Sequence, residues 1–183
     1  MEDLLILVDK HDKPRGTMPK MQAHQLGELH RAFSIFLFNQ QGQLLIQQRA
    51  FHKYHSAGQW ANSCCSHPKP TELTLDAANR RLGEELNITS NLIHIGEFIY
   101  QSEVNGGLIE HEYDHIYIGL FDDLISPNFQ EVAATRWIDI KSLYDEIKNN
   151  PQNYTEWLKI ILTHYSASTI ENWFSQLQTP IQI

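Results

Sequence analysis

The sequence predicts an α/β (α+β) fold in which a mixed β-sheet lies between layers of helices. Three observations predict it: several runs rich in β-forming residues, one amphipathic helix in the middle of the chain, and helical stretches that close it. Elements that bury one apolar face stack into layers, and strands on both sides of a single central helix favour a mixed sheet. Because 183 residues is a usual length for one domain, we expect a single domain over 1–183.

The first half of the chain contains strand signals and one long loop. Residues 4–8 form a short apolar run that predicts a first strand, and residues 9–16 are rich in turn-forming types. Residues 32–38 and 43–48 flank a four-residue loop that contains glycine, a pattern typical of a hairpin. Residues 50–71 have no clear period and predict a long loop, and loops this long in compact domains are usually functional.

The second half begins with a change to the period of a helix over 72–86. Leu75, Ala78, Leu82 and Leu86 recur at spacings of three and four residues, which predicts an amphipathic helix. The later elements are predicted as strands at 93–101, 113–121 and 134–138, and as helices at 140–149 and 155–177 with a break at Asn149-Asn150-Pro151.

Charge and cysteine content restrict the functional class. The net charge is −8, from 14 Lys and Arg against 22 Asp and Glu, which argues against nucleic acid as a partner. A phosphorylated small molecule stays compatible if a metal ion and a few basic residues supply positive charge. The adjacent Cys64 and Cys65 make a poor disulfide pair, the N-terminus lacks a signal-peptide pattern, and no apolar run approaches a membrane span. We therefore expect a cytoplasmic protein without a membrane partner.

The most informative strand carries a group of acids. Over residues 109–120 the side chains alternate, so that Glu110, Glu112 and Asp114 share a face with the apolar residues further along. Acids crowded on an inner face must bind protons or a cation, and a divalent metal would leave one acid poised for proton transfer. The alternative is a strand end that frays into solvent with hydrated carboxylates.

Four of the ten histidines lie near this potential chemistry: His24, His30, His67 and His111. His24 and His30 are six positions apart, a spacing that a continuous helix would place on different faces. Gly27 between them suggests a break that lets both side chains reach one point. Neutral imidazoles and carboxylates suit Mn, Mg or Zn as ligands. The alternative for each histidine alone is an exposed polar side chain.

Cys65 lies in a setting that shifts the pKa of a thiol. It precedes a histidine by two residues, in the glycine- and proline-containing stretch 58–68, just upstream of the predicted helix. Such a setting makes a cysteine reactive in many enzymes. The alternative is a buried, inert thiol, which is what we expect of its neighbour Cys64.

The segment from Ser66 to Ile88 keeps the spacing of a known motif. It reads S-x5-E-x7-R-R-L-x-E-E-x-N-I, and the Nudix box is G-x5-E-x7-R-E-U-x-E-E-x-G-U, where U is a bulky apolar residue. The matching residues are Glu72, Arg80, Leu82, Glu84, Glu85 and Ile88. A match at fixed offsets over this length is specific and implies a Nudix-like α/β/α layered fold.

Arg81 is the departure from the box with the largest chemical consequence. Nudix hydrolases use a glutamate at this position, within a cluster that gathers divalent metals to activate water against a diphosphate. An arginine removes a ligand and adds a repelling charge. We therefore expect no ordinary diphosphate hydrolysis, and we expect Arg81 to pair with Glu85, one helical turn later.

With the altered box, the segment Asn62-Ser63-Cys64-Cys65-Ser66-His67-Pro68 resembles the type 1 isopentenyl-diphosphate isomerases. The resemblance extends from about residue 3 to residue 160, through 23–24, 29–34, 44–46, 49–50, 58–62, Tyr100, 110–112 and Trp157. It implies an enzyme that interconverts isopentenyl and dimethylallyl diphosphate by adding a proton to an alkene and removing another from the neighbouring carbon. It also implies that C-terminal helices at about 140–177 cover the site.

The resemblance implies a role for each matching residue. The proton-handling residues correspond to Cys65 and Glu112. The metal ligands correspond to His24, His30, His67, Glu110 and Glu112, and Glu85 corresponds to the residue that binds the Mg²⁺ carried by the substrate. Tyr100 corresponds to a hydrogen-bonding residue of the site, and Trp157 to a residue that offers an aromatic face. The residues that match diphosphate-binding positions are Lys20, Arg49, Lys53 and Arg81.

Several alternatives stay open at this stage. Mn²⁺, Zn²⁺ or Mg²⁺ fits the site of three histidines and two glutamates. A Nudix-type diphosphate hydrolase is the alternative function, disfavoured by Arg81, and a non-catalytic ligand-binding domain is disfavoured by the retained Cys65 and Glu112. The plainer role of Trp157 is helix packing. We expect a monomer whose only partner is a small diphosphate.

Overall fold

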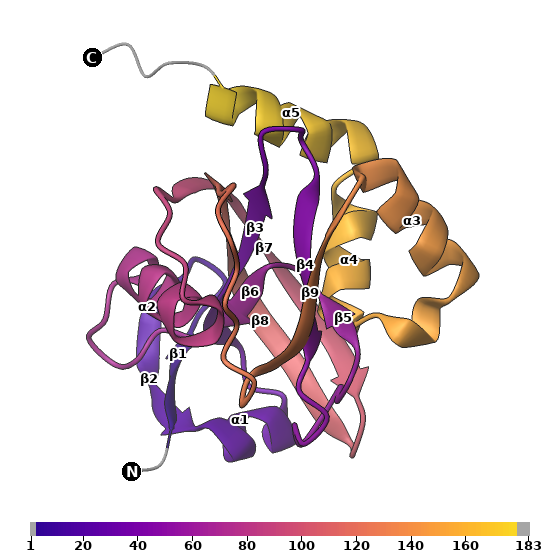
Figure 1. Cartoon of the computed structure of the whole chain (residues 1–183). Helices are drawn as coiled ribbons and strands as arrows, with labels where there is room; N and C mark the ends of the chain where they lie inside the picture. The colour runs from indigo at the N-terminus through magenta and orange to yellow at the C-terminus, as the bar shows by residue number, and fades with distance from the viewer. Residues whose placement is uncertain (1–2, 179–183) are drawn as a thin grey trace, which may run out of the picture.

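The computed structural model describes residues 3–178 and confirms the layered fold with a mixed sheet (Figure 1). The strands are β1 (Leu4–Val8), β2 (Pro14–Pro19), β3 (His30–Phe38), β4 (Leu44–Arg49), β5 (Trp60–Ala61), β6 (Cys64–Ser66), β7 (Ile93–Val104), β8 (Leu108–Leu120) and β9 (Val132–Ile138). The helices are α1 (Lys20–Leu26), α2 (Thr74–Leu86), α3 (Ile140–Asn149), α4 (Glu156–His164) and α5 (Ala167–Gln178), with a short 3-10 turn, η1 (Pro151–Asn153).

The structure differs from the sequence-based predictions mainly at the short elements. The turn expected over 9–16 includes the first half of β2, a strand that pairs antiparallel with β1. The loop expected over 50–71 contains β5 and β6. The helix predicted over 155–177 is two helices, because Tyr165 is extended between α4 and α5. Partners in the sheet, rather than local periodicity, define strands of two to six residues, so their sequences carry little signal.

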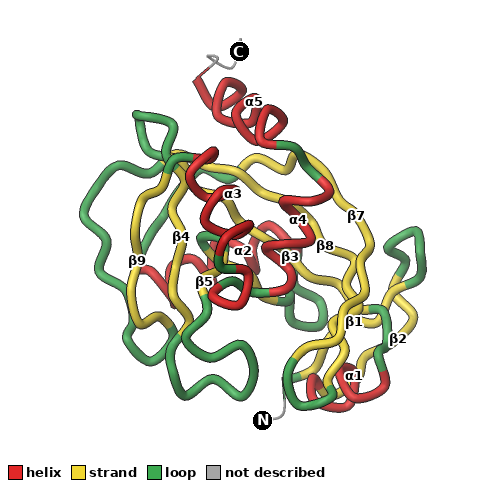
Figure 2. Tube along the Cα trace, turned by 90° about the vertical axis from the view of Figure 1, so that its right-hand side faces the viewer, coloured by secondary structure: helices red, strands yellow, loops and turns green. Residues whose placement is uncertain are grey.

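The predicted hairpin between β3 and β4 is present, but the two strands separate directly after the turn. Strands β3 and β4 pair only at Phe38 and Leu44. Beyond that point β4 pairs with β9, while β3 runs parallel to β8 (Figure 2). The short strand β6 pairs with β3 in the opened region, where Cys65 lies opposite Ser34. The split of the sheet therefore brings the cysteine segment to the middle of the molecule.

Alternation along β3 separates two cores. Phe33, Ile35 and Leu37 face α2, whereas Phe36 and Phe38 face the C-terminal helices α3, α4 and α5. In Figure 1, α2 lies on one side of the sheet and the C-terminal helices on the other. Side chains on a strand point alternately to the two faces, so each face packs against its own helical layer.

The helices of the described chain, residues 3–178, do not include one that is both long and apolar enough to cross a membrane.

Candidate active site

Strand β8 presents its acids to the interior, as its alternation predicted. Glu110, Glu112 and Asp114 are 4%, 9% and 0% exposed, so the strand end does not fray into solvent. The parallel register places Glu112 beside His30 of β3, and the antiparallel register places it beside Tyr100 of β7. Buried carboxylates at such spacing require protons or a cation.

The first two predicted histidine ligands are held by backbone carbonyls. His24 lies in the last turn of α1 with its Nδ1 2.6 Å from the carbonyl oxygen of Lys20, and His30 begins β3 with its Nδ1 2.8 Å from that of Glu28. A carbonyl only accepts, so each Nδ1 carries the proton and donates. In both rings Nε2 is then directed inward with a lone pair available for a metal ion.

Four side chains from four segments converge within 4.8 Å at their ligand atoms: His24, His30, His67 and Glu110. Nε2 of His24 is 3.0 Å from a Glu110 oxygen. Nε2 of His30 is completely buried and has no hydrogen-bond partner among residues 3–178. A buried nitrogen without a partner costs stability unless something binds it. The donor set therefore fits a divalent cation of the Mn, Zn or Mg class.

Glu112 joins this cluster to a tyrosine. One carboxylate oxygen is 2.9 Å from Nε2 of His67 and 3.8 Å from Nε2 of His30, and the other accepts a 2.6 Å hydrogen bond from Tyr100. Burial opposes ionisation, but the interactions with His30 and His67 outweigh it and lower the pKa of Glu112 well below its usual value. Glu112 is thus an anion in a nearly closed environment.

Cys65 lies on the same face of the sheet as Glu112. It pairs with Ser34 of β3, which is itself opposite Ile116 of β8, and Ile116 shares its face with Glu112. Both side chains line one cavity of about 90 Å³. Burial raises the pKa of the Cys65 thiol, with a smaller opposing effect from Arg49. The sequence suggested a pKa shift that makes Cys65 reactive. The shift is instead upward, so the group stays a thiol and does not become a reactive thiolate. Cys64 is fully buried, as expected.

All four predicted basic residues line the same cavity: Lys20, Arg49, Lys53 and Arg81. Trp157 of α4 lines it too, with the Arg49 guanidinium 5.0 Å from its ring centre. Trp157 is 5% exposed and belongs to the core under the C-terminal helices. It therefore both packs, as its plainer interpretation held, and forms part of the cavity wall.

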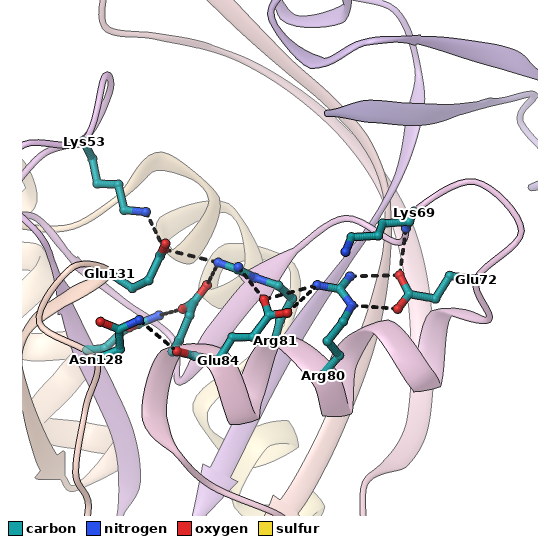
Figure 3. A network of polar contacts seen from close by, with 10 residues as sticks. Lys53, Lys69, Glu72, Arg80, Arg81, Glu84, Asn128 and Glu131 are labelled. Atoms are coloured by element: carbon teal, nitrogen blue, oxygen red, sulfur yellow. Dashed lines mark hydrogen bonds and ion pairs between the residues drawn. The ribbon is translucent and has the colours of Figure 1, made fainter. Parts of the chain in front are cut away.

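Arg81 is the centre of a polar network on α2 (Figure 3). Its guanidinium is 2.5 Å from Glu85, 2.7 Å from Glu84 and 3.2 Å from Glu131. The predicted pairing with Glu85 is confirmed. Glu131 also contacts Lys53 at 2.5 Å, so one acid links two of the basic groups that line the cavity. Arg81 thus forms ion pairs with both adjacent acids of the altered box, Glu84 and Glu85.

Among the residues that line the cavity and were missed from the sequence are Tyr54, His55 and Glu131. His55 is 6% exposed, with Nε2 3.4 Å from Glu110 and its ring 5.9 Å from that of Trp157. Burial lowers its pKa to about 3, so the ring is neutral. These residues stand in irregular segments, where no period shows which side chains point inward.

One predicted histidine lies elsewhere. His111 points to the opposite face of β8 from Glu110 and Glu112, and its Nδ1 is 2.8 Å from the carbonyl oxygen of Gly27. It lines a separate surface cavity next to β1. Its position follows from alternation, since odd and even residues of a strand face opposite sides.

Gly27 provides the break expected between His24 and His30. Its φ of 67° ends α1 in the left-handed conformation, and a Cβ there would lie 3.2 Å from Ile109.

We expect Gly27→Ala to lower the free energy of unfolding by about 1–2 kcal/mol and to weaken metal binding. Urea unfolding with chelator and metal titration measure the two effects. Gly107→Ala is the control, since Gly107 has φ of 71° in open space, and it should lose stability but keep metal affinity. Equal metal affinity in both variants would contradict this role.

Comparisons with known proteins agree with one another. The family model described as "NUDIX domain" matches residues 28–158. The chain is 50% identical to "Isopentenyl-diphosphate Delta-isomerase" of Serratia proteamaculans, over 94% of this chain and 97% of the relative. It is 46% identical to the protein of the same name from Burkholderia multivorans, over 94% and 98%. A crystal structure of DR0079 from Deinococcus radiodurans, at 19% identity, superposes with a TM-score of 0.74 over 89% of this chain and 99% of that one. This last likeness concerns the fold alone.

Proposed function

Since this chain belongs to the NUDIX domain family and, within it, to the isopentenyl-diphosphate Delta-isomerases, we propose that Cys65 and Glu112 carry out its proton transfers. The reaction interconverts isopentenyl and dimethylallyl diphosphate by moving a carbon–carbon double bond. The observation that supports this assignment best is the presence of a thiol and a carboxylate, with opposite resting protonation, on the walls of one small cavity.

The alkene has no activating group, so the reaction requires an acid near one carbon and a base near its neighbour. The thiol of Cys65 holds its proton because burial raises its pKa, and Glu112 has lost its proton because His30 and His67 stabilise the anion. The Tyr100 hydroxyl donates to Glu112 and fixes the orientation of the carboxylate. One group of the pair gives a proton to the substrate, the other takes one, and the protein regains its resting protonation by exchange with solvent.

The intermediate of such a transfer is a tertiary carbocation, which water would convert to an alcohol. We propose that the bound substrate, together with buried side chains from α4 and the sheet such as Trp157 and Tyr100, keeps water away from this cation. Trp157 offers an aromatic face, an interaction with a cation that is worth about 2 kcal/mol or more in a desolvated site. The negative charge of Glu112 on the same cavity adds to this stabilisation.

A divalent metal would be held by His24, His30, His67, Glu110 and Glu112, and a second, Mg²⁺, would be bound with the substrate through Glu85. When bound, these ions fix the position and acidity of Glu112 and offset the charge of the diphosphate. Whether Mn²⁺, Zn²⁺ or Mg²⁺ fills the histidine site follows from metal analysis of the purified protein. Chelation should abolish turnover, and His67→Ala or Glu110→Gln should reduce the bound metal.

The diphosphate lies against the basic groups of the same cavity. Lys20, Arg49 and Lys53 line it together with Arg81, and Glu85 accepts a 2.9 Å hydrogen bond from Gln47 beside them. A local group of four basic side chains binds a small anion in spite of the chain's net charge of −8.

We expect Arg81→Gln to raise KM by about ten- to hundredfold, because a hydrogen bond between two charged groups contributes about 1.5–3 kcal/mol. Steady-state kinetics with isopentenyl diphosphate measures the change. Arg80→Gln is the matched control, since Arg80 precedes it on α2, pairs with Glu72 and Glu84, and does not line the cavity. A KM that rises equally in both variants would argue for a purely structural role of Arg81.

Deuterium incorporation tests the function directly. The protein is incubated with isopentenyl diphosphate and Mg²⁺ in deuterated water, and the product is examined by NMR and mass spectrometry. We expect deuterium in dimethylallyl diphosphate and no release of phosphate. Phosphate release without isomerisation would favour the diphosphate hydrolase, which the Arg81 network disfavours.

The remaining features of the proposal concern the whole chain. We propose that residues 1–183 form one functional domain, with helices over about 140–177 covering the site, and that it works as a cytoplasmic monomer without nucleic acid or membrane. Support comes from the acidic composition and from the packing of α4 against the cavity. Size-exclusion chromatography with light scattering tests the monomer, and cell fractionation tests the compartment.

A further inference from the structure

A second group of metal-ligating side chains lies on the opposite face of β8 from the active-site cavity. Glu112 and Asp114 lie on the face of β8 that bears the cavity, so His115, the residue after Asp114, lies on the opposite face. In the β7–β8 register His115 lies opposite Glu97, and Tyr117 lies opposite His94. The group consists of His94, Glu97 and His115, and no residue of it belongs to the proposed isomerase site.

A β-bulge brings this group together. His94 and Glu97 are three positions apart, a spacing that places side chains on opposite faces of a regular strand. The register shifts between His94 and Gly96, and the extra residue turns His94 to the face of Glu97. Bulges commonly re-aim a side chain in this way, and here the result is three ligand-type groups at one place.

The distances within the group suit a shared cation. Nε2 of His94 is 3.4 Å from Nδ1 of His115 and 3.3 Å from a Glu97 oxygen, and all three ligand atoms lie within 4.8 Å of one another. The side chains of His94 and Glu97 are 41% and 43% exposed, so water has access to complete the coordination.

A carboxylate behind His115 fixes its tautomer. Nε2 of His115 is 3.1 Å from an Asp12 oxygen, and Asp12 is itself held by a 2.7 Å hydrogen bond from Arg31 to its other oxygen. The Asp12 carboxylate accepts this hydrogen bond, so His115 donates through Nε2–H and keeps its Nδ1 lone pair toward His94 and Glu97. A carboxylate that orients a histidine is the usual support of a metal ligand.

We propose that His94, Glu97 and His115 form a second, surface binding site for a borderline divalent cation such as Zn²⁺, separate from the isomerase cavity. Two imidazoles with one carboxylate select Zn²⁺, Co²⁺, Ni²⁺ or Cu²⁺ over the harder Mg²⁺ and Ca²⁺. A cation there links β7 to β8 and, through Asp12, to the turn between β1 and β2, so it stabilises the strand that carries Glu110 and Glu112. The proposal stands independently of the reaction in the cavity.

Metal titration of the whole protein tests the proposal. Zn²⁺ binding is measured by equilibrium dialysis, and Co²⁺ binding by its visible absorption, with wild type, His94→Ala, His115→Ala and His67→Ala. We expect wild type to bind one equivalent more than His94→Ala or His115→Ala, and we expect these two to keep the wild-type rate of isomerisation. His67→Ala should keep the surface equivalent while it loses the cavity metal. An excess of Mg²⁺ should not displace the surface ion.

Two further variants keep the test decisive. Glu97→Gln changes an exposed side chain and removes one ligand, so weaker Zn²⁺ binding without loss of folding supports the site. His11→Ala removes an exposed histidine outside the group and should bind as wild type. Wild-type stoichiometry and affinity in both His94→Ala and Glu97→Gln would overturn the proposal. Loss of all Zn²⁺ binding in His67→Ala would overturn it as well.

Discussion

Replacing Cys65 with alanine is expected to lower kcat by about 10²–10⁴-fold, the range that a positioned acid or base contributes. The change removes one of the two groups that exchange protons with the alkene and leaves the basic residues around the diphosphate in place. KM should therefore change little. A coupled assay for dimethylallyl diphosphate measures kcat, and thermal unfolding checks that the variant is folded.

The neighbouring cysteine is a matched control for this result. Cys64 is fully buried against α2 and does not line the cavity, so Cys64→Ala removes a chemically identical group one residue away. It should cost some stability and leave kcat within a few-fold of wild type. If Cys65→Ala kept turnover within a few-fold of the parent, the proposed thiol–carboxylate pair would be wrong.

The second large effect is expected for Glu112→Gln, with a fall in kcat of about 10²–10⁴-fold. The amide cannot accept a proton, and it no longer attracts His30 and His67 as the anion does. It also removes one of the five proposed metal ligands, so bound metal should fall in parallel. Rapid-quench kinetics and metal analysis of the same preparation measure the two changes.

Asp114→Asn is the control for the loss of a carboxylate on this strand. Burial, together with the charge of Glu112, raises the pKa of Asp114 well above its usual value, so its carboxyl is protonated. A carboxyl with a raised folded-state pKa stabilises the fold below its unfolded pKa and loses that contribution as pH rises. Asparagine replaces the neutral acid without this loss, so we expect unchanged or higher stability at neutral pH and near-normal kcat. A thousandfold loss of kcat in Asp114→Asn would mean that any amide on this face of β8 disrupts the site, and the effect of Glu112→Gln could then not be assigned to proton transfer.

The two controls share a physical reason. Positions that are adjacent in sequence differ in function because a strand sends alternate side chains to opposite faces, and because positions along one face lie at different depths. Cys64 packs against α2 while Cys65 faces the cavity. Glu112 is hydrogen-bonded to His67 and Tyr100, whereas the carboxyl of Asp114, on the same face, is hydrogen-bonded to the Ser34 hydroxyl.

The sequence by itself determined the features that depend on local period. The alternation of 109–120 was enough to predict that Glu110, Glu112 and Asp114 share the buried face of β8. The recurrence of apolar residues from Leu75 to Leu86 predicted α2, and the four-residue separation on that helix predicted the pairing of Arg81 with Glu85. These features lie within one element, where geometry follows directly from residue spacing.

Only the tertiary structure decided which residues meet. His55 and Glu131 approach the cavity from irregular segments, and the ligand atoms of His24, His30 and His67 converge because α1, β3 and the segment after β6 are brought against β8. Burial also set the direction of the Cys65 pKa shift. Strand register, chain closure and desolvation arise between elements that are far apart in sequence, and no local pattern records them.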